Sequence, residues 1–303
     1  MLDTLLSGQL LFAALATGAT YALVAVGLNL VYGTMRLLNI AHGDVAMLGG
    51  YATFWGFSLL GLSPLIGIVL VALFGAALGV LAYRGLFRRL LGARRPVAQL
   101  ESNSLLVFFG LSIIAQNLTA LTFSASAQGY QFLPDVLRFG SVAITQNRLL
   151  AMAVALLVCL AIVVYLRFSV AGLAMRALIE HRDAAAVVGV DVERVQWMSF
   201  AIGFATAAIA GALVSMTEQV SPFMGFPLTI AAFIVVILGG LGNVLGGMIA
   251  ALLLGLIEVY GVALTSATYR SILLYGLFVV ILLFRPQGLL GRCLLYTSPS
   301  PRD

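Results

Sequence analysis

Long apolar runs recur along almost the whole of this 303-residue chain, and they constrain its fold more than any other feature. Most runs approach the length of about 20 residues that an α-helix needs to cross the hydrocarbon core of a bilayer. Inside lipid, only helices and closed barrels satisfy every backbone polar group, and continuous rather than alternating apolar runs select helices. Hydrophobic residues make up 62% of the chain and charged residues only 9%. A soluble domain, in which about a quarter of the residues are charged, is therefore excluded.

The apolar pattern predicts an all-α polytopic membrane protein, a bundle of eight or nine transmembrane helices. The seventh segment is short and ends at GGLGN, so it fits a short span, a re-entrant half-helix or part of one long broken helix. Small residues recur in the segments, which favours close helix packing. The predicted segments are Leu10–Tyr32, Gly43–Leu60, Pro64–Tyr83, Ser104–Phe123, Leu149–Leu166, Trp197–Met216, Phe226–Leu238, Val244–Val262 and Ser271–Phe284.

The basic residues predict the orientation of these segments. All 16 are arginines, and with nine crossings 13 of them fall on one side and three on the other. Cytoplasmic loops carry the excess of positive charge, so the side with 13 is expected to face the cytoplasm and the amino terminus the outside. This count requires a chain reversal at Gly239–Asn243, because fusing the seventh and eighth segments would place Arg285 and Arg292 outside. The three external arginines are Arg138, Arg148 and Arg270.

A charged stretch, Arg176–Arg194, interrupts the apolar sequence on the predicted cytoplasmic side. Polar helical segments between membrane spans usually contact something in the aqueous phase, and we expect that partner to be another protein. The alternative is a solvated amphipathic linker.

Two sets of polar residues are candidates for function within the membrane. Asn39, His42 and Asp44 lie at the start of the second segment, where they either cap that helix or line a path for a solute. The second set consists of polar residues inside or at the ends of spans, which either join helices by hydrogen bonds or contact a solute: Asn29, Gln116, Asn117, Glu218, Gln219, Asn243 and Glu258. So few permanent charges suit a small zwitterion or a neutral solute better than an ion. The candidate residues for the path or its gate are Asn29, Asn39, His42, Asp44, Gln116, Asn117, Glu218 and Asn243.

Several other functions are disfavoured by what the sequence lacks. The chain has no lysine, so it cannot form a Walker A motif, and GGLGNVLG does not have the spacing of a dinucleotide-binding loop. The two histidines are far apart, no Cys/His cluster has the spacing of metal ligands, and no G-x-S-x-G nucleophile motif occurs. Because the arginines lie in short loops, they indicate topology rather than nucleic acid binding. We therefore expect no enzyme activity, no cofactor, no metal and no nucleic acid partner in this chain.

Six stretches resemble the LivH/LivM family of permeases. These are the membrane subunits of branched-chain amino acid ABC importers, and the family includes urea and amide permeases. The likeness covers about Gly8–Arg292, and NIAHGD followed by GGLGN is its most specific part. The pattern after the first span favours the LivH type. The six stretches are GATYALVAVGLNLVYGTMRLLNIAHGDVAMLGGY from Gly18, GLSIIAQN from Gly110, GLAMRALIEHRDAAAVVGVDVERV from Gly172, SPFMGF from Ser221, LGGLGNVLGGMIAALLLGLIE from Leu238, and RPQGLLGR from Arg285.

The resemblance implies a permease domain over residues 1–292, with a cytoplasmic coupling loop at about 171–195 that docks into a cleft on an ATPase subunit. It implies that Ala185 and Gly189 pack closely on that partner. His181 replaces the acidic residue common at its position. The polar residues of the implied contact are Arg176, Glu180, Arg182 and Asp183. Residues 293–303, CLLYTSPSPRD, differ in composition and are expected to form a tail foreign to the permease domain.

The function implied is that of a multi-pass permease in the bacterial inner membrane. Such a permease works with a LivM-like sister permease, two cytoplasmic ABC ATPase subunits that hold the ATP, and a periplasmic substrate-binding protein. The expected solute is a branched-chain or other hydrophobic amino acid. The alternatives are a urea or short-chain amide ABC permease, an ion-coupled secondary carrier, and a structural or assembly protein that transports nothing.

Overall fold

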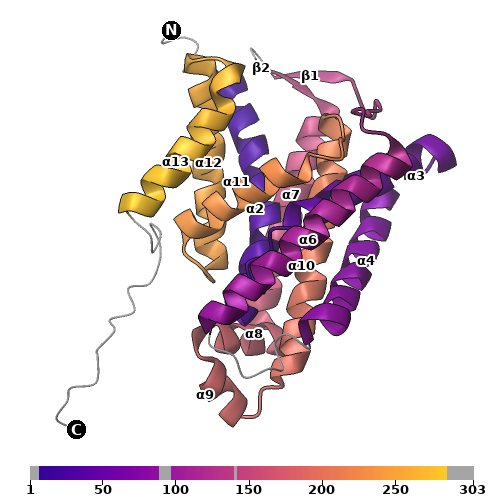
Figure 1. Ribbon diagram of the computed structural model, residues 1–303. Helices are drawn as coiled ribbons and strands as arrows, with labels where there is room; N and C mark the ends of the chain where they lie inside the picture. Colours follow the sequence, from indigo (N-terminus) through magenta and orange to yellow (C-terminus); the bar gives the residue numbers. More distant parts are fainter. Residues whose placement is uncertain (1–6, 89–96, 140–141, 285–303) are drawn as a thin grey trace.

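The computed structural model describes residues 7–88, 97–139 and 142–284, and its helices form one bundle (Figure 1). The expected boundary at residue 292 and the tail 293–303 lie outside these residues. The helices are α2 (Gly8–Met35), α3 (His42–Leu60), α4 (Pro64–Ala82), α6 (Val97–Phe123), α7 (Gln146–Phe168), α8 (Val170–Glu180), α9 (Arg182–Val187), α10 (Val192–Thr217), α11 (Gly225–Gly239), α12 (Val244–Leu264) and α13 (Arg270–Phe284); a π-helical turn, Tyr83–Phe87, extends α4, and a 3₁₀ turn, Ala267–Tyr269, precedes α13.

Each predicted apolar segment forms a helix, which confirms the helical membrane bundle. Within the described residues, α2, α4 with its π-turn, α6, α7, α10 and α12 are long and apolar enough to cross a bilayer. The seventh segment is α11, whose 15 residues span about 22 Å at 1.5 Å per residue, less than the bilayer core of about 30 Å. The chain then reverses as predicted, because Gly240 and Gly242 adopt positive φ angles of 94° and 84°.

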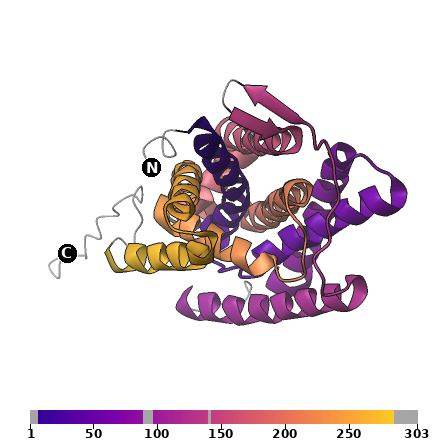
Figure 2. The ribbon, with the colours of Figure 1, turned by 90° about the horizontal axis from the view of Figure 1, so that it is seen from above.

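The core lies around α2 and α10, the two most buried of these helices (Figure 2). Their backbones approach closely at Gly27 and Gly203, where an added Cβ on either residue would meet backbone atoms of the other. Gly75 and Gly79 of α4 approach the backbone of α10 in the same way. Packing drives helix association in lipid, so these small residues explain why the bundle is compact.

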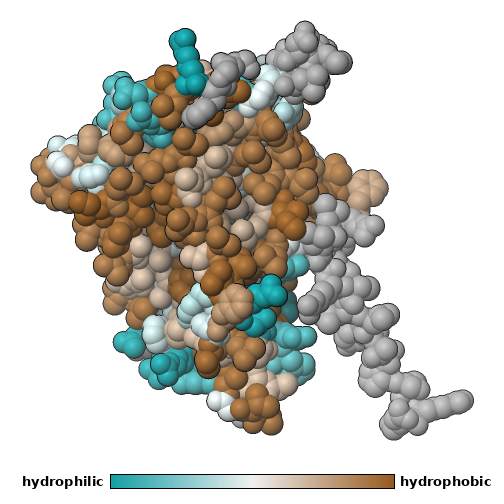
Figure 3. Space-filling view, turned by 180° about the vertical axis from the view of Figure 1, so that it is seen from behind, coloured by the Kyte–Doolittle hydropathy of each residue, from teal (hydrophilic) through white to brown (hydrophobic). Residues whose placement is uncertain are grey.

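The two ends of the bundle differ. One end carries an antiparallel hairpin of β1 (Val136–Phe139) and β2 (Val142–Thr145), in which Val136 pairs with Thr145 and Phe139 with Val142. This hairpin and an isolated antiparallel bridge between Gln128 and Val220 depart from the predicted all-α structure in the described part of the chain. The other end carries α8 and α9 (Figure 1). A broad hydrophobic belt separates hydrophilic residues at the two ends (Figure 3).

The arginines assign the two ends to the two sides of the membrane. Arg138 and Arg148 belong to the hairpin end, whereas the α8–α9 end carries Arg176 and Arg182 and is reached by Arg88, which pairs with Glu193 at 2.9 Å. By the positive-inside rule, the α8–α9 end is cytoplasmic and the hairpin end extracytoplasmic.

Candidate functional site

Helix α3 begins in the middle of the bundle rather than at its surface. After α2 ends at Met35, the chain returns into the bundle without helical structure, and the Nε2 atom of His42 lies 3.0 Å from the carbonyl oxygen of Val24. Val24 is close to the middle of α2. Irregular backbone is tolerated at this depth only where protein or a water-filled cavity surrounds it, and Leu37 and Asn39 are completely buried.

The amino-terminal end of α11 meets the amino-terminal end of α3. The backbone N–H of Gly43 donates to the Thr229 hydroxyl oxygen at 2.9 Å, and that hydroxyl donates to the carbonyl of Ile40 at 2.9 Å. A Cβ on Gly43 would run into the carbonyl oxygen of Gly225. Two helix amino termini, each with a partial positive charge, therefore converge on one point inside the bundle.

Polar side chains gather at this point. The Nε2 atom of Gln116 donates to Oδ1 of Asp44 at 3.0 Å and lies 3.0 Å from the Ser112 hydroxyl, to which it also donates. Asn39, His42 and Asp44 are each at most 1% exposed. We call Asn39, His42, Asp44 and Gln116 the α3 cluster. The sequence predicted all four as candidates. The fold joins Asp44 of α3 to Gln116 of α6, and it buries Asn39 and His42 just before and at the start of α3.

Part of the α3 cluster has no hydrogen-bond partner in the described part of the chain. These atoms are both polar atoms of the Asn39 amide, Nδ1 of His42 and Oδ2 of Asp44. Tyr51 and Trp55, further along α3, also bury a polar atom without a partner. A buried unsatisfied polar group costs about 1–3 kcal/mol, so a group of them calls for a functional explanation.

Asn29 and Asn243 lie elsewhere and hold the turn between α11 and α12. The Asn29 amide donates to the carbonyl of Asn243 at 2.8 Å and accepts from the N–H of Gly242 at 2.6 Å. The Asn243 side chain caps α12 by accepting from the N–H of Gly246 at 3.0 Å. These contacts fit the hydrogen-bonding alternative for Asn29 and Asn243 rather than contact with a solute, because they hold the turn.

Asn117 also differs from expectation. Its side chain is exposed on the outer face of α6, beside Ile113 and Leu118, and its amide donates to the carbonyl of Ile113 one turn back at 2.8 Å. A helix carries residues of both faces, and only the face with Ser112 and Gln116 turns toward the bundle.

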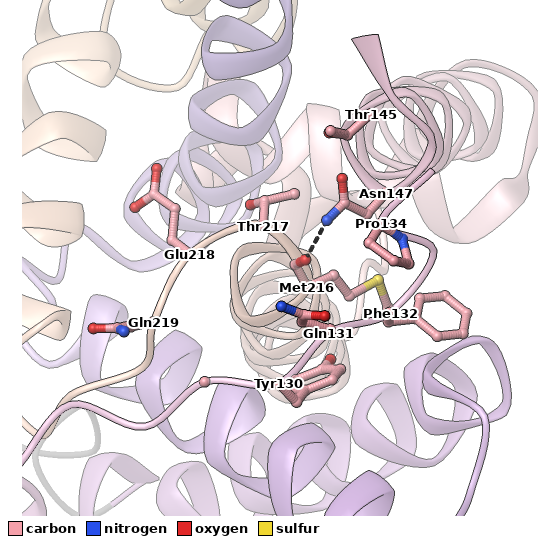
Figure 4. Close-up of a pocket in the computed structure, with 11 residues that line it drawn as sticks. Tyr130, Gln131, Phe132, Pro134, Thr145, Asn147, Met216, Thr217, Glu218 and Gln219 are labelled. Atoms are coloured by element: carbon pink, nitrogen blue, oxygen red, sulfur yellow. Dashed lines mark hydrogen bonds between the residues drawn. The ribbon is translucent and has the colours of Figure 1, made fainter. Parts of the chain in front are cut away.

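Glu218 lies at the extracytoplasmic end of α10, beside a surface cavity of about 470 Å³ (Figure 4). The amide of Asn147 crosses part of this cavity and donates to the carbonyl of Met216 at 2.9 Å. In the wall, the Tyr130 hydroxyl lies 3.2 Å from the Ser215 hydroxyl, and burial raises the pKa of Tyr130 while this hydrogen bond opposes the rise. The Glu218 side chain points away from Tyr130 and Gln131 (Figure 4), and Glu218 also lines a second cavity. The first cavity also contacts Gly129, Phe132, Pro134, Thr145, Thr217 and Gln219.

Helices α8 and α9 form a capped pair at the cytoplasmic end. The Ser169 hydroxyl caps α8, and Nδ1 of His181 accepts from the N–H of Ala184 at 3.1 Å to cap α9. Helix α9 closes with a Schellman turn: the N–H of Gly189 donates to the carbonyl of Ala186, and that of Val190 to the carbonyl of Ala185. Gly189 has a φ of 89°, which favours glycine.

One residue of the α8–α9 pair, Ala185, does not lie on the surface where we expected it to contact a partner. Ala185 is 3% exposed and packs in the core of its own chain, so its contacts are intramolecular. Val187 and Val188, which we did not single out, are 87% and 78% exposed at the tip. The remaining predicted residues of the loop are exposed, namely Arg176, Glu180, Arg182, Asp183 and Gly189.

Sequence reasoning missed two further groups of residues. Thr229 and Gly225 anchor α11 against α3, and only Gly225 carried a signal, because it lies in the SPFMGF stretch. The other group is a triad in which the Tyr21 hydroxyl donates to the buried Glu258 at 2.6 Å and the half-exposed Arg270 pairs with the second carboxylate oxygen. The sequence predicted for Glu258 either hydrogen bonding between helices or contact with a solute, but it did not predict this ion pair.

A multi-pass helical bundle with broken helices meeting at its centre and a capped helix pair on its cytoplasmic face defines a membrane transport permease. The chain belongs to the family described as "Branched-chain amino acid transport system / permease component", whose profile matches residues 10–282. It is 33% identical to the high-affinity branched-chain amino acid permease LivH of Salmonella typhimurium, with 94% of this chain and 95% of that protein covered. It has the same identity and coverage to BraD of Pseudomonas aeruginosa.

The sister permease LivM of Salmonella typhimurium is also similar, with 30% identity over 89% of this chain and 67% of LivM. No solved structure matches the chain significantly. The family resemblance read from the motifs is confirmed, and the chain is a multi-pass protein of the bacterial inner membrane.

Proposed function

We propose that this chain is a permease subunit of an ABC importer for branched-chain amino acids. It works beside a LivM-like permease, is driven by two cytoplasmic ATPase subunits and receives its solute from an extracytoplasmic binding protein. The family match and the printed names of the LivH and BraD relatives support the substrate class. The absence of lysine supports placing ATP on the partner subunits, because a Walker A motif requires one.

The observation that carries the coupling role is the exposed tip of α9. Val187 and Val188 extend almost fully into the aqueous phase on the cytoplasmic side, where adjacent exposed valines suit a protein contact. The Schellman turn at Gly189 fixes the valines in position. The polar residues around them are Arg182 and Asp183, which form the rim of the proposed contact with the ATPase.

Replacing both valines tests the coupling role. We expect the double variant Val187→Asp/Val188→Asp to insert into the membrane normally but to lose copurification with the ATPase subunits, because two buried charges oppose docking. Val136→Asp is the matched control, since Val136 is an exposed valine at the opposite end of the bundle. Normal ATPase binding and uptake by the double variant would contradict the proposal. Uptake that persists without the ATPase would instead identify an ion-coupled carrier.

The α3 cluster supports a role as the gate of the solute path. It lies at mid-depth, where two helix amino termini meet, and its unpartnered atoms on Asn39, His42 and Asp44 are free to form new hydrogen bonds when the bundle opens. Broken helices of this kind are used for binding and gating in transporters. The buried Asp44 carboxylate is stabilised by the two helix termini.

The gate is tested with Asp44→Asn, which keeps the size of the side chain and removes its charge. Helix-terminus interactions with a partly buried charge reach about 2 kcal/mol, so we expect the maximal uptake rate to fall by about tenfold or more while the complex still assembles. Asp135→Asn, at an exposed loop position, is the control. Unchanged uptake kinetics after simultaneous alanine replacement of Asn39, His42 and Asp44 would contradict the role of these residues as a gate.

A further inference from the structure

A second cavity of about 170 Å³ opens near the extracytoplasmic end, between α2, α7, α10, α11 and α13. It shares Thr217 and Glu218 with the larger cavity described above. The two cavities therefore lie on either side of the end of α10. Leu228 lines this second cavity, and the next residue, Thr229, anchors α11 to α3. A residue of the cavity wall is thus next in the chain to the residue that anchors α11 to α3.

The charged residues around this cavity are one ion pair, Arg270 with Glu258, and two further residues, Arg148 and Glu218, that form no ion pair among the described residues. Arg270 pairs with Glu258, and the second oxygen of Glu258 accepts from the Tyr21 hydroxyl. Glu258 is 3% exposed, and each of its oxygens accepts a hydrogen bond within the chain, so its charge is already paired. Arg148 and Glu218 each lack an ion-pair partner in the described part of the chain, and both line the cavity.

The rest of the wall is either weakly polar or apolar. Thr17 and Thr20 contribute hydroxyl groups from α2. The apolar part is supplied by four helices and consists of Ala13, Ala16, Ala151, Met152, Val214 and Leu228. A mostly apolar wall with a few placed polar groups is the usual composition of a small-molecule site.

We propose that this cavity is a reception site for the zwitterionic head of an aliphatic amino acid, with Arg148 binding the α-carboxylate and Glu218 the α-ammonium group. The aliphatic side chain then lies against Met152, Val214 and Leu228. One free cation and one free anion match a zwitterion, and guanidinium groups bind carboxylates with two parallel hydrogen bonds. Urea and simple amides carry neither charge and would form no ion pair with these two groups. The inference rests on the proposed function and assigns two residues to the recognition of its substrate.

The test is transport by the whole importer, reconstituted in vesicles with its ATPase subunits and its leucine-loaded binding protein. We expect Arg148→Gln and Glu218→Gln each to reduce the maximal leucine transport rate by about 10- to 100-fold, the range for losing a hydrogen bond to a charged group. Both variants should still copurify with the ATPase subunits. Arg138→Gln, an exposed arginine of β1 that does not line the cavity, should transport at the wild-type rate.

A charge exchange separates recognition from general damage. The double variant Arg148→Glu/Glu218→Arg should transport leucine better than either of the single variants Arg148→Glu and Glu218→Arg, because it restores one charge of each sign. Wild-type transport rates in both glutamine variants would overturn the reception site while leaving the importer function intact. A wild-type complex that carries urea but no amino acid would overturn the proposed function itself.

Discussion

Single polar residues in this bundle divide into those that hold the fold and those that are free to act, and Asn29 is an example of the first kind. It lies in a transmembrane helix, is completely buried, and connects α2 to the turn before α12 with both ends of its amide. Its amide therefore serves the fold by holding the turn.

Asn29→Leu should therefore destabilise the protein. The change leaves the partly buried N–H of Gly242 without its acceptor and removes one of the two hydrogen bonds to the Asn243 carbonyl, so we expect the free energy of unfolding to fall by about 1–3 kcal/mol. Thermal unfolding in detergent measures the effect. Asn117→Leu is the matched control, because Asn117 is exposed and bonds only to its own helix, and it should leave the unfolding temperature nearly unchanged. Equal losses of thermal stability in Asn29→Leu and Asn117→Leu would mean that Asn29 does not hold the fold more than Asn117 does.

Residue types alone could predict that Asn39, His42, Asp44 and Gln116 matter, because polar groups in a span require an explanation. They could not predict that Asp44 would bond to Gln116 while Asn29 and Asn243 would hold a turn elsewhere. That outcome depends on where α3 begins and on which face of α6 turns inward, and both are set by long-range packing. Thr229 carried no signal at all, since a threonine in an apolar helix is common.

Among the elements, the short helices α3 and α11 give the bundle its central feature. The apolar pattern predicted both and placed the reversal at Gly239–Asn243 correctly, because glycine-rich turns have a local signature. The meeting of their amino termini depends on Gly43 and Gly225, which pack without side chains between them. A single sequence does not pair two glycines more than 180 residues apart.

The close approach of α3 and α11 predicts that Gly43→Ala is damaging. The added methyl group would collide with the backbone of Gly225 and with the Thr229 hydroxyl, and overpacking of this kind costs about 1–3 kcal/mol. We expect reduced thermal stability and strongly reduced uptake. Gly56→Ala lies in the same helix, where a Cβ meets nothing within 4 Å, and it should behave as wild type. Normal uptake by Gly43→Ala would mean that the two helices separate more easily than their packing indicates.

The molecule as a whole carries an extracytoplasmic cavity at one end, buried polar residues in its interior and the capped pair α8–α9 at the other end. The arginine distribution predicted this orientation without any structure, because it depends on counts rather than on contacts. The proposed coupling role requires α9 to face the cytoplasm, since only there can it meet an ATPase.

Sided labelling measures this orientation directly. Both native cysteines are first replaced, by Cys159→Ala and Cys293→Ser. Two single-cysteine variants, Asp183→Cys on α9 and Val136→Cys on the hairpin, are then treated with a membrane-impermeant thiol reagent. The account predicts that intact cells with a permeabilised outer membrane label only Val136→Cys, that inside-out vesicles label only Asp183→Cys, and that bound ATPase subunits protect the latter. Labelling of Asp183→Cys from the outside would show that α9 does not face the cytoplasm and would rule out the contact with the ATPase.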